Sequence, residues 1–116
     1  MPRRRAAFLG HAWVAVDIGG RGVMDRLRTE ITLSPEGRAH GSGGCNRFTG
    51  AYELDGARLR FGRMASTRMA CAPAAMEQER RFHEALAAVA GWRLEGGLLH
   101  LTDAAGASLI RLSRAE

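Results

Sequence analysis

FTGAYELDGARLRF, residues 48–61, places the dipeptide Asp55-Gly56 between two runs in which apolar and polar residues alternate. A two-residue Asp-Gly link favours the tight turn whose twist matches that of two antiparallel strands. Alternation with a period of two indicates strands that bury one face only. The stretch therefore predicts a β-hairpin formed by Phe48 to Leu54 and Ala57 to Phe61.

On both sides of this hairpin, glycine and other turn residues recur every eight to twelve residues, a spacing typical of short antiparallel strands. In the run from Leu27 to Leu33, Leu27, Thr29, Ile31 and Leu33 form one face and charged or polar residues form the other. The further strands that we expect are 12–18, 27–33, 38–42, 92–94, 98–102 and 108–112, with a short extended segment at 64–69.

Residues 73–90 differ, because they are rich in Ala, Glu, Gln and Arg, which favour a helix. Pro73 suits the first helical position and Gly91 the position just past the end. Ala75, Phe82 and Leu86 fall on one stripe at 3.6 residues per turn, together with Val89. The fold class that follows is α+β and β-dominated: a curved antiparallel sheet, partly barrel-like, packed against one long helix.

Two polar residues of this helix, Gln78 and Glu79, flank the apolar stripe on either side. A carboxylate so close to a core is costly unless it has a partner. We expect either Arg68 or a backbone turn to be the partner of Glu79. The alternative is an edge position from which Glu79 reaches water.

Length and composition suit one ordinary domain: 116 residues, of which 46% are hydrophobic and 25% charged. We expect a basic N-terminal tail over residues 1–9 and a single domain over 10–116.

All 17 basic residues are Arg and the net charge is +5. Without Arg3, Arg4 and Arg5, fourteen basic residues face twelve acidic ones, which argues against a specific nucleic-acid partner. No apolar run approaches the ~18 residues of a transmembrane helix, and no apolar segment of a secretory signal follows the basic start.

The two cysteines, Cys45 and Cys71, permit one internal disulfide, and the alternative is two independent buried thiols. Together with His40 and His83 they supply ligand types that zinc accepts. The short ligand spacings of zinc sites are absent, so we expect no metal and no cofactor.

Common catalytic motifs are incomplete in this sequence. A phosphate-binding Walker loop needs a lysine, and the chain has none. His83-Glu84 begins a zinc-protease motif, but Ala87 stands where the second histidine belongs. We therefore expect no enzymatic activity, and a small enzyme that uses Glu79 or His83 as a base is the less favoured alternative.

The segment GSGGCNRFTGAY, residues 41–52, combines four glycines with the one asparagine of the chain, Asn46. Glycine and asparagine tolerate backbone conformations that other residues avoid. One interpretation is a bulge that leads from one strand into the next. The other is a nest of free amides that binds an anion.

Four pieces of the chain carry a resemblance to a known family. They are Trp13, the block G-C-N-x-x-x-G-x-Y at 44–52, the block T-x-M-A-C at 67–71, and Q-E-x-x-F at 78–82. With these pieces the chain resembles the META domain family, also called HslJ-like. The resemblance implies a mostly antiparallel β structure wrapped against one helix.

The resemblance also implies a non-enzymatic, stress-related protein of the bacterial envelope, in a family linked to heat shock and novobiocin resistance. Its partner would be an unknown protein or envelope component, which it binds or stabilises; the alternative is a module that binds a small apolar ligand or lipid. The family blocks point to a candidate patch of Asn46, Arg47, Arg68 and Glu79. Both cysteines fall inside these blocks, which favours a disulfide of the kind found in the periplasm. Because no signal sequence is visible, a cytoplasmic location stays open.

Overall fold

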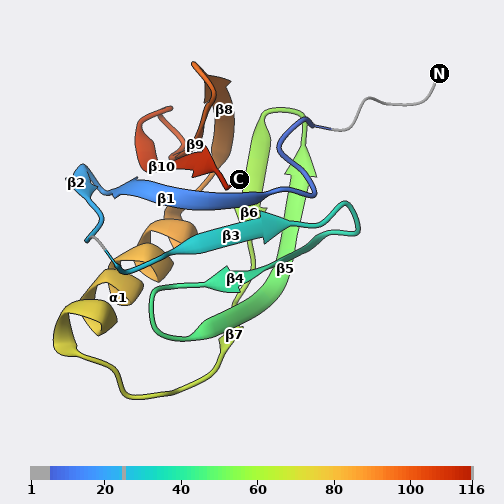
Figure 1. Ribbon diagram of the computed structural model, residues 1–116. Helices are drawn as coiled ribbons and strands as arrows, with labels where there is room; N and C mark the ends of the chain where they lie inside the picture. The colour runs from blue at the N-terminus through green and yellow to red at the C-terminus, as the bar shows by residue number, and fades with distance from the viewer. Residues whose placement is uncertain (1–5, 25, 116) are drawn as a thin grey trace.

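The computed structural model describes residues 6–24 and 26–115 (Figure 1). One helix, α1 (Pro73–Ala88), accompanies the strands. The strands are β1 (Ala12–Ile18), β2 (Arg21–Gly22), β3 (Glu30–Leu33), β4 (Arg38–Ser42), β5 (Arg47–Asp55), β6 (Arg58–Phe61), β7 (Ala65–Ser66), β8 (Gly91–Glu95), β9 (Leu98–Thr102) and β10 (Ser108–Arg114).

All strand pairs are antiparallel, and the sheet closes on itself like a ring. The order runs β10-β9-β8-β6-β5-β4-β3-β1-β2, and β10 also pairs with β1. The short strand β7 lies off this path and pairs with β5. The ring has one thin seam, where β6 and β8 pair only through Arg58 and Gly91. The predicted α+β class with a curved antiparallel sheet and one helix is confirmed.

A hairpin of β5 and β6 forms where the sequence predicts one, with its turn displaced by one residue. Leu54 pairs with Leu59 and Asp55 with Arg58, so the link holds two residues, Gly56 and Ala57. Gly56 has a φ of 61°, a left-handed conformation that glycine adopts without strain. The turn lies one residue later than Asp55-Gly56, since Asp55 belongs to β5.

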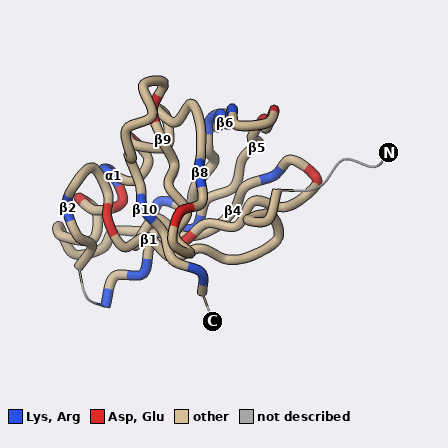
Figure 2. The backbone as a smooth tube through the Cα atoms, turned by 90° about the horizontal axis from the view of Figure 1, so that it is seen from above, with Lys and Arg blue, Asp and Glu red and all other residues tan. Residues whose placement is uncertain are grey.

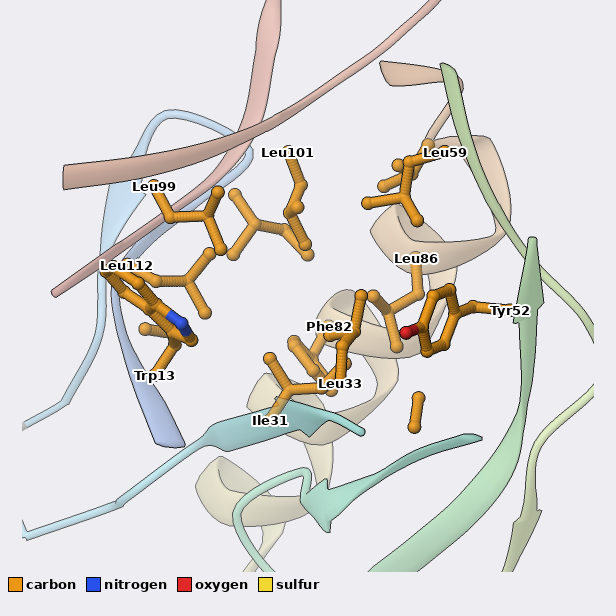
Figure 3. Close-up of a cluster of buried hydrophobic side chains, with 14 of the residues drawn as sticks. Trp13, Ile31, Leu33, Tyr52, Leu59, Phe82, Leu86, Leu99, Leu101 and Leu112 are labelled. Carbon is orange, nitrogen blue, oxygen red and sulfur yellow. The ribbon is translucent and has the colours of Figure 1, made fainter. Parts of the chain in front are cut away.

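The core fills the ring with side chains that alternate in burial along strands such as β3 and β5, whereas β2, β7 and β8 contribute no buried residue. Helix α1 packs against β1, β6 and β10 and adds Phe82 and Leu86 (Figure 1). Figure 3 shows these two side chains converging with Ile31 and Leu33 from β3. The remaining large members of the core are Phe8, Trp13, Ile18, Phe48, Tyr52, Leu59, Val89, Leu99, Leu101, Ile110 and Leu112.

The segment before β1 contributes to this core. Phe8 is fully buried, its ring lies 4.6 Å from that of Trp92, and its carbonyl accepts a hydrogen bond from Trp13 Nε1 at 2.9 Å. Residues 1–5 of the expected tail lie outside the described residues. Phe8, in the described part of that tail, therefore packs on the domain. The three arginines that precede it in the sequence had suggested a tail without such packing.

Several element boundaries differ from the expected ones for local reasons. The strand expected from Leu27 begins at Glu30, because Arg26 has a φ of 71° and Leu27 N–H turns back to the Met24 carbonyl at 3.2 Å. The helix ends at Ala88 instead of 90, because Val89 is extended with a ψ of 133°. Of the segment expected to be extended over 64–69, only β7 pairs as a strand.

Within residues 6–24 and 26–115, no helix combines the length and apolar character that a membrane crossing requires.

Candidate functional site

Three segments that are distant in the sequence meet beside the first half of α1. They are the turn 43–46 between β4 and β5, the segment 67–71 after β7, and the helix residue Glu79. We call this meeting point the Asn46–Glu79 junction, defined by Cys45, Asn46, Thr67, Met69 and Glu79. It includes two of the four residues of the candidate patch.

Glu79 has a backbone turn as its partner, which was one of its two expected partners. Its Oε1 accepts hydrogen bonds from the backbone N–H groups of Cys45 at 3.0 Å and Asn46 at 2.6 Å, and its Oε2 accepts one from Asn46 Nδ2 at 2.9 Å. Arg68 makes no ion pair with it among the described residues. Burial alone would raise the pKa of the Glu79 carboxyl, but the hydrogen bonds from Asn46 and Cys45 outweigh burial and lower that pKa below its usual value.

Asn46 connects the helix to the segment 67–71. Its side-chain oxygen accepts hydrogen bonds from Met69 N–H at 2.6 Å and Thr67 Oγ1 at 2.9 Å. Its amide nitrogen donates to Glu79 and, at 3.5 Å, to the Met69 carbonyl. The residue is 6% exposed, and both amide hydrogens and both lone pairs of the oxygen have partners. An asparagine is therefore required here as donor and acceptor at once.

The glycines of the turn make the close approach of Glu79 possible. A Cβ on Gly43 would lie 2.7 Å from Glu79 Cγ and 2.8 Å from its Oε1, so any side chain there would have to displace the Glu79 carboxylate. Gly44 has a φ of 127°, which disfavours other residues. The segment thus links β4 to β5, as the first interpretation expected. Its backbone N–H groups at Cys45 and Asn46 bind a carboxylate of the same chain, that of Glu79.

A disulfide joins Cys45 to Cys71, with 6.1 Å between their Cα atoms. It ties the turn 43–46 covalently to the segment 67–71, parallel to the hydrogen bonds of Asn46. The bonded cysteines cannot act as thiolate ligands. Among the described residues, no group of three or more His, Cys, Asp or Glu side chains stands where it could hold a metal ion.

A second buried network lies around Gln78, the helix residue before Glu79. The residue is 2% exposed; its Nε2 donates to Thr29 Oγ1 at 2.9 Å, and its Oε1 accepts from Met24 N–H at 2.9 Å. Thr29 Oγ1 in turn donates to the Gly43 carbonyl at 2.8 Å. The networks of Gln78 and Glu79 therefore hold the same turn from two sides. The sequence placed Gln78 beside the apolar stripe, but it gave no indication of these partners.

The other two patch residues, Arg47 and Arg68, lie at the outer rim of the junction. Both are exposed. Their segments are paired, because Arg47 N–H donates to Thr67 Oγ1 at 3.2 Å and Thr67 N–H donates to the Arg47 carbonyl at 3.0 Å. Neither guanidinium meets a carboxylate within the described part of the chain. Asn46 and Glu79 of the candidate patch thus lie inside the junction, and Arg47 and Arg68 lie on the segments at its rim.

His83, the other candidate base, follows Glu79 by one helical turn. Its ring lies 5.2 Å from that of Phe48 and 5.4 Å from that of Phe82, and its Nε2 is buried without a hydrogen-bond partner among the described residues. Burial lowers the pKa of His83, although the charge of Glu79 opposes this effect. Burial thus disfavours the charged form of the ring, which packs beside Phe48 and Phe82.

Charges of both signs are interspersed over the molecule, as Figure 2 shows for the helix, the strands and the hairpin ends. On α1, Arg80 bridges Glu77 at 2.8 Å and Glu84 at 2.9 Å.

The chain matches the META domain family over residues 6–116. Among solved structures, it resembles one determined by NMR at 30% identity, covering 89% of this chain and 87% of that chain, with a TM-score of 0.68. It also resembles an NMR structure of a protein from Burkholderia xenovorans at 26% identity, covering 93% and 83% of the two chains, with a TM-score of 0.73.

A DUF4847 family protein from Bacteroides vulgatus shares the fold in its crystal structure, at 17% identity, with a TM-score of 0.69 and coverage of 92% of this chain and 94% of that chain. Among curated proteins, none matches this chain. The match over residues 6–116 extends across the whole ring, the helix and the Asn46–Glu79 junction, and this chain belongs to the META domain family.

Proposed function

We propose that the protein is a non-enzymatic module of the bacterial envelope that binds or stabilises a partner protein or envelope component under stress. One observation carries the proposal: the polar residues of the family blocks hold the fold together. Asn46 and Glu79 use their side chains on each other and on nearby backbone. A carboxylate that three N–H groups already occupy is a poor general base.

The disulfide supports an envelope location. Disulfides persist in oxidising compartments such as the periplasm and are rare in the reducing cytosol. Cys45 and Cys71 close a loop with a sequence separation of 26, which includes the β5–β6 hairpin and β7. Cross-linking a loop of this length strengthens a domain that must remain folded without cytosolic chaperones.

The contact surface of the proposed module is the rim of the Asn46–Glu79 junction. Arg47 and Arg68 present two guanidinium groups from adjacent, mutually bonded segments. Since the disulfide and Asn46 fix these segments, little backbone freedom would be lost on binding. Two such forks suit a carboxylate or phosphate of the partner.

The alternative of a small apolar ligand has less support, because side chains of the core occupy the inside of the ring (Figure 3). An apolar ligand would have to displace them. A thermal-shift series with fatty acids tests this alternative, since a ligand that binds the native state raises the midpoint of unfolding.

The test of the proposed function is complementation of a deletion strain of the host, challenged with heat and with novobiocin. Wild type is expected to restore survival and to fractionate with the periplasm or envelope. Arg47→Ala/Arg68→Ala is expected to accumulate normally but to fail in complementation. The matched control is Arg58→Ala/Arg60→Ala, which removes two exposed arginines from β6, away from the junction.

Two results would refute the proposal. One is a deletion strain that grows like its parent under both stresses. The other is a protein that fractionates with the cytosol and is recovered there with free thiols.

A further inference from the structure

Methionines make up most of the exposed large apolar side chains in the described part of the chain. Met24, Met69 and Met76 have exposed fractions of 49%, 57% and 47%, and the one other such side chain is Leu94 at 39%. Single apolar residues are common on protein surfaces, so exposure alone carries no meaning. The bias towards one residue type does, because methionine differs from leucine in its thioether sulfur, which is polarisable and can be oxidised.

The three exposed methionines lie around the first half of α1. Met76 is part of the helix. Met24 N–H donates to the side chain of Gln78 on the helix at 2.9 Å, and Met69 N–H donates to Asn46 Oδ1 at 2.6 Å within the Asn46–Glu79 junction. In both networks the methionine contributes backbone atoms and not its sulfur. The hydrogen bonds that hold this part of the fold therefore do not depend on the chemical state of the thioethers.

Met64 provides a contrast within the same molecule. It is partly buried and packs against the core, and its Sδ lies so close to β5 that a Cβ on Gly50 would overlap it. Oxidation turns a flexible apolar thioether into a polar sulfoxide, which disrupts a core. An oxygen atom on Met64 would displace the side chain from β5, whereas on an exposed methionine it can be hydrated. The fold thus tolerates oxidation at Met24, Met69 and Met76 better than at Met64.

The groups that usually compete with thioethers for an oxidant are missing. Cys45 and Cys71 are joined in the disulfide, so neither offers a thiol. The chain contains no lysine, whose amine competes for hypohalous acids by forming a chloramine. Hypohalous acids oxidise thioethers quickly, whereas hydrogen peroxide does so slowly. The exposed thioethers are therefore the most reactive groups that a hypohalous acid can reach on the described surface.

We infer that Met24, Met69 and Met76 take up oxygen from hypochlorous acid, so that the folded protein consumes this oxidant. The lone pair of Sδ attacks the chlorine atom and releases hydroxide; water then adds to sulfur, and chloride and two protons leave. Sulfur loses two electrons and chlorine gains them, and the net products are a sulfoxide, chloride and one proton. Methionine sulfoxide reductases can restore the thioether.

This reaction is stoichiometric and needs no partner protein. It is therefore compatible with a non-enzymatic protein and separate from the proposed binding at Arg47 and Arg68. The two can be tested independently.

Titration of the purified protein with hypochlorous acid, followed by intact-mass analysis and peptide mapping, tests the inference. Met24, Met69 and Met76 are expected to gain one oxygen atom each, and Met64 is expected to react about tenfold more slowly because it is partly buried. The midpoint of urea unfolding should change little once the three exposed sites are oxidised. In protein unfolded in urea beforehand, Met64 should react as fast as the other three.

Leucine variants supply an independent readout, since leucine keeps the apolar shape and removes the sulfur. Met24→Leu/Met69→Leu/Met76→Leu is expected to consume hypochlorous acid about tenfold more slowly than wild type, because only the slower groups remain. Met64→Leu is the matched control and should consume it as fast as wild type.

Three results would overturn the inference. The first is a folded protein in which Met64 is oxidised as fast as Met69. The second is loss of the native state as the first oxygen atoms are added, and the third is a triple variant that consumes the oxidant as fast as wild type.

Discussion

Asn46 and Glu79 face each other as amide and carboxylate, joined by backbone N–H to Oε1 at 2.6 Å and by Nδ2 to Oε2 at 2.9 Å. The donors are all on the turn and the acceptors all on the helix. Mutation can exchange the donor and the acceptor of the Nδ2–Oε2 hydrogen bond, because Asn and Asp, and likewise Gln and Glu, have nearly the same shape.

Each single reversal is expected to destabilise the protein. Glu79→Gln turns an NH₂ group towards Asn46 Nδ2, and Asn46→Asp turns a carboxylate towards that of Glu79. We expect a loss of about 1–3 kcal/mol in the free energy of unfolding for the first and about 3–5 kcal/mol for the second. The double variant Asn46→Asp/Glu79→Gln restores a donor opposite an acceptor, and should be more stable than Asn46→Asp alone. Urea unfolding of the four proteins gives the coupling energy of the cycle.

Additive effects in that cycle would contradict the geometry. They would mean that the two residues act independently, without the direct contact described here.

A side chain at Gly43 is expected to destabilise the protein. Gly43→Ala places a Cβ against Glu79 Cγ and Oε1, and should cost about 1–3 kcal/mol of stability through displacement of the carboxylate. The control is Gly22→Ala in β2, where a Cβ would meet nothing within 4 Å and the backbone has no left-handed conformation. Chemical unfolding of both variants checks the difference, and equal stability of the two would disprove the close approach.

The disulfide is expected to stabilise the fold by about 3–4 kcal/mol in the chain-entropy treatment of its loop. Intact-mass analysis after alkylation should add two alkyl groups only after reduction, for protein purified from its own host. Cys45→Ala/Cys71→Ala should unfold at lower urea and show no further change with reductant. Thiols that alkylate without reduction would rule out the bond.

The titrations of His83 and Glu79 are expected to lower the free energy of unfolding as the pH falls. Burial lowers the folded-state pKa of His83 below 6.5, so below that pH the unfolded chain binds more protons and the free energy of unfolding falls. The hydrogen bonds from Asn46 and Cys45 lower the folded-state pKa of Glu79 below 4.5. The stability that Glu79 confers is therefore complete above that pH and is lost as pH falls through the folded-state pKa.

Urea unfolding from about pH 8 to pH 3 should show both declines in wild type, and Glu79→Gln should keep only the upper one of the two. An unchanged lower decline in that variant would show that other carboxylates are responsible.

Phe8 tests the extent of the domain. Because it is fully buried against Trp92, Phe8→Ala should cost about 3–5 kcal/mol. Leu9→Ala, a neighbouring change at a partly buried position, should cost less. Comparable and small effects of both would place the start of the domain after this segment.

Local patterns in the sequence predicted the elements but not the connections between them. The hairpin at Asp55-Gly56 and the stripe of Phe82 and Leu86 depend on neighbouring residues, and both were confirmed. Thr29 was assigned to the inward face of its run and is fully buried, although β3 begins one residue later. Phe8 escaped prediction because the charges that precede it are typical of a tail.

The candidate site was likewise predictable in its local features but not in the contacts between distant residues. That Glu79 needs a partner could be predicted from its place on the helix, since an unpaired carboxylate near a core is costly. That the partner is Asn46 could not, because the two residues are 33 positions apart and the ring closure determines their meeting. Gln78 and Thr29, separated by 49 positions, were beyond local reasoning for the same reason.

The pairing of β1 with β10 sets a condition on how the protein is made. These two strands are the first and last of the described chain, and Trp13 pairs with Arg114. A ribosome must therefore release the chain through β10 before the ring can close, and such distant contacts slow folding. A copy that stops before Ser108 would expose the open edges of both β1 and β9 and would be prone to aggregation. The emergence of β10 is thus the step that turns a sheet with two unpaired edges into a closed ring.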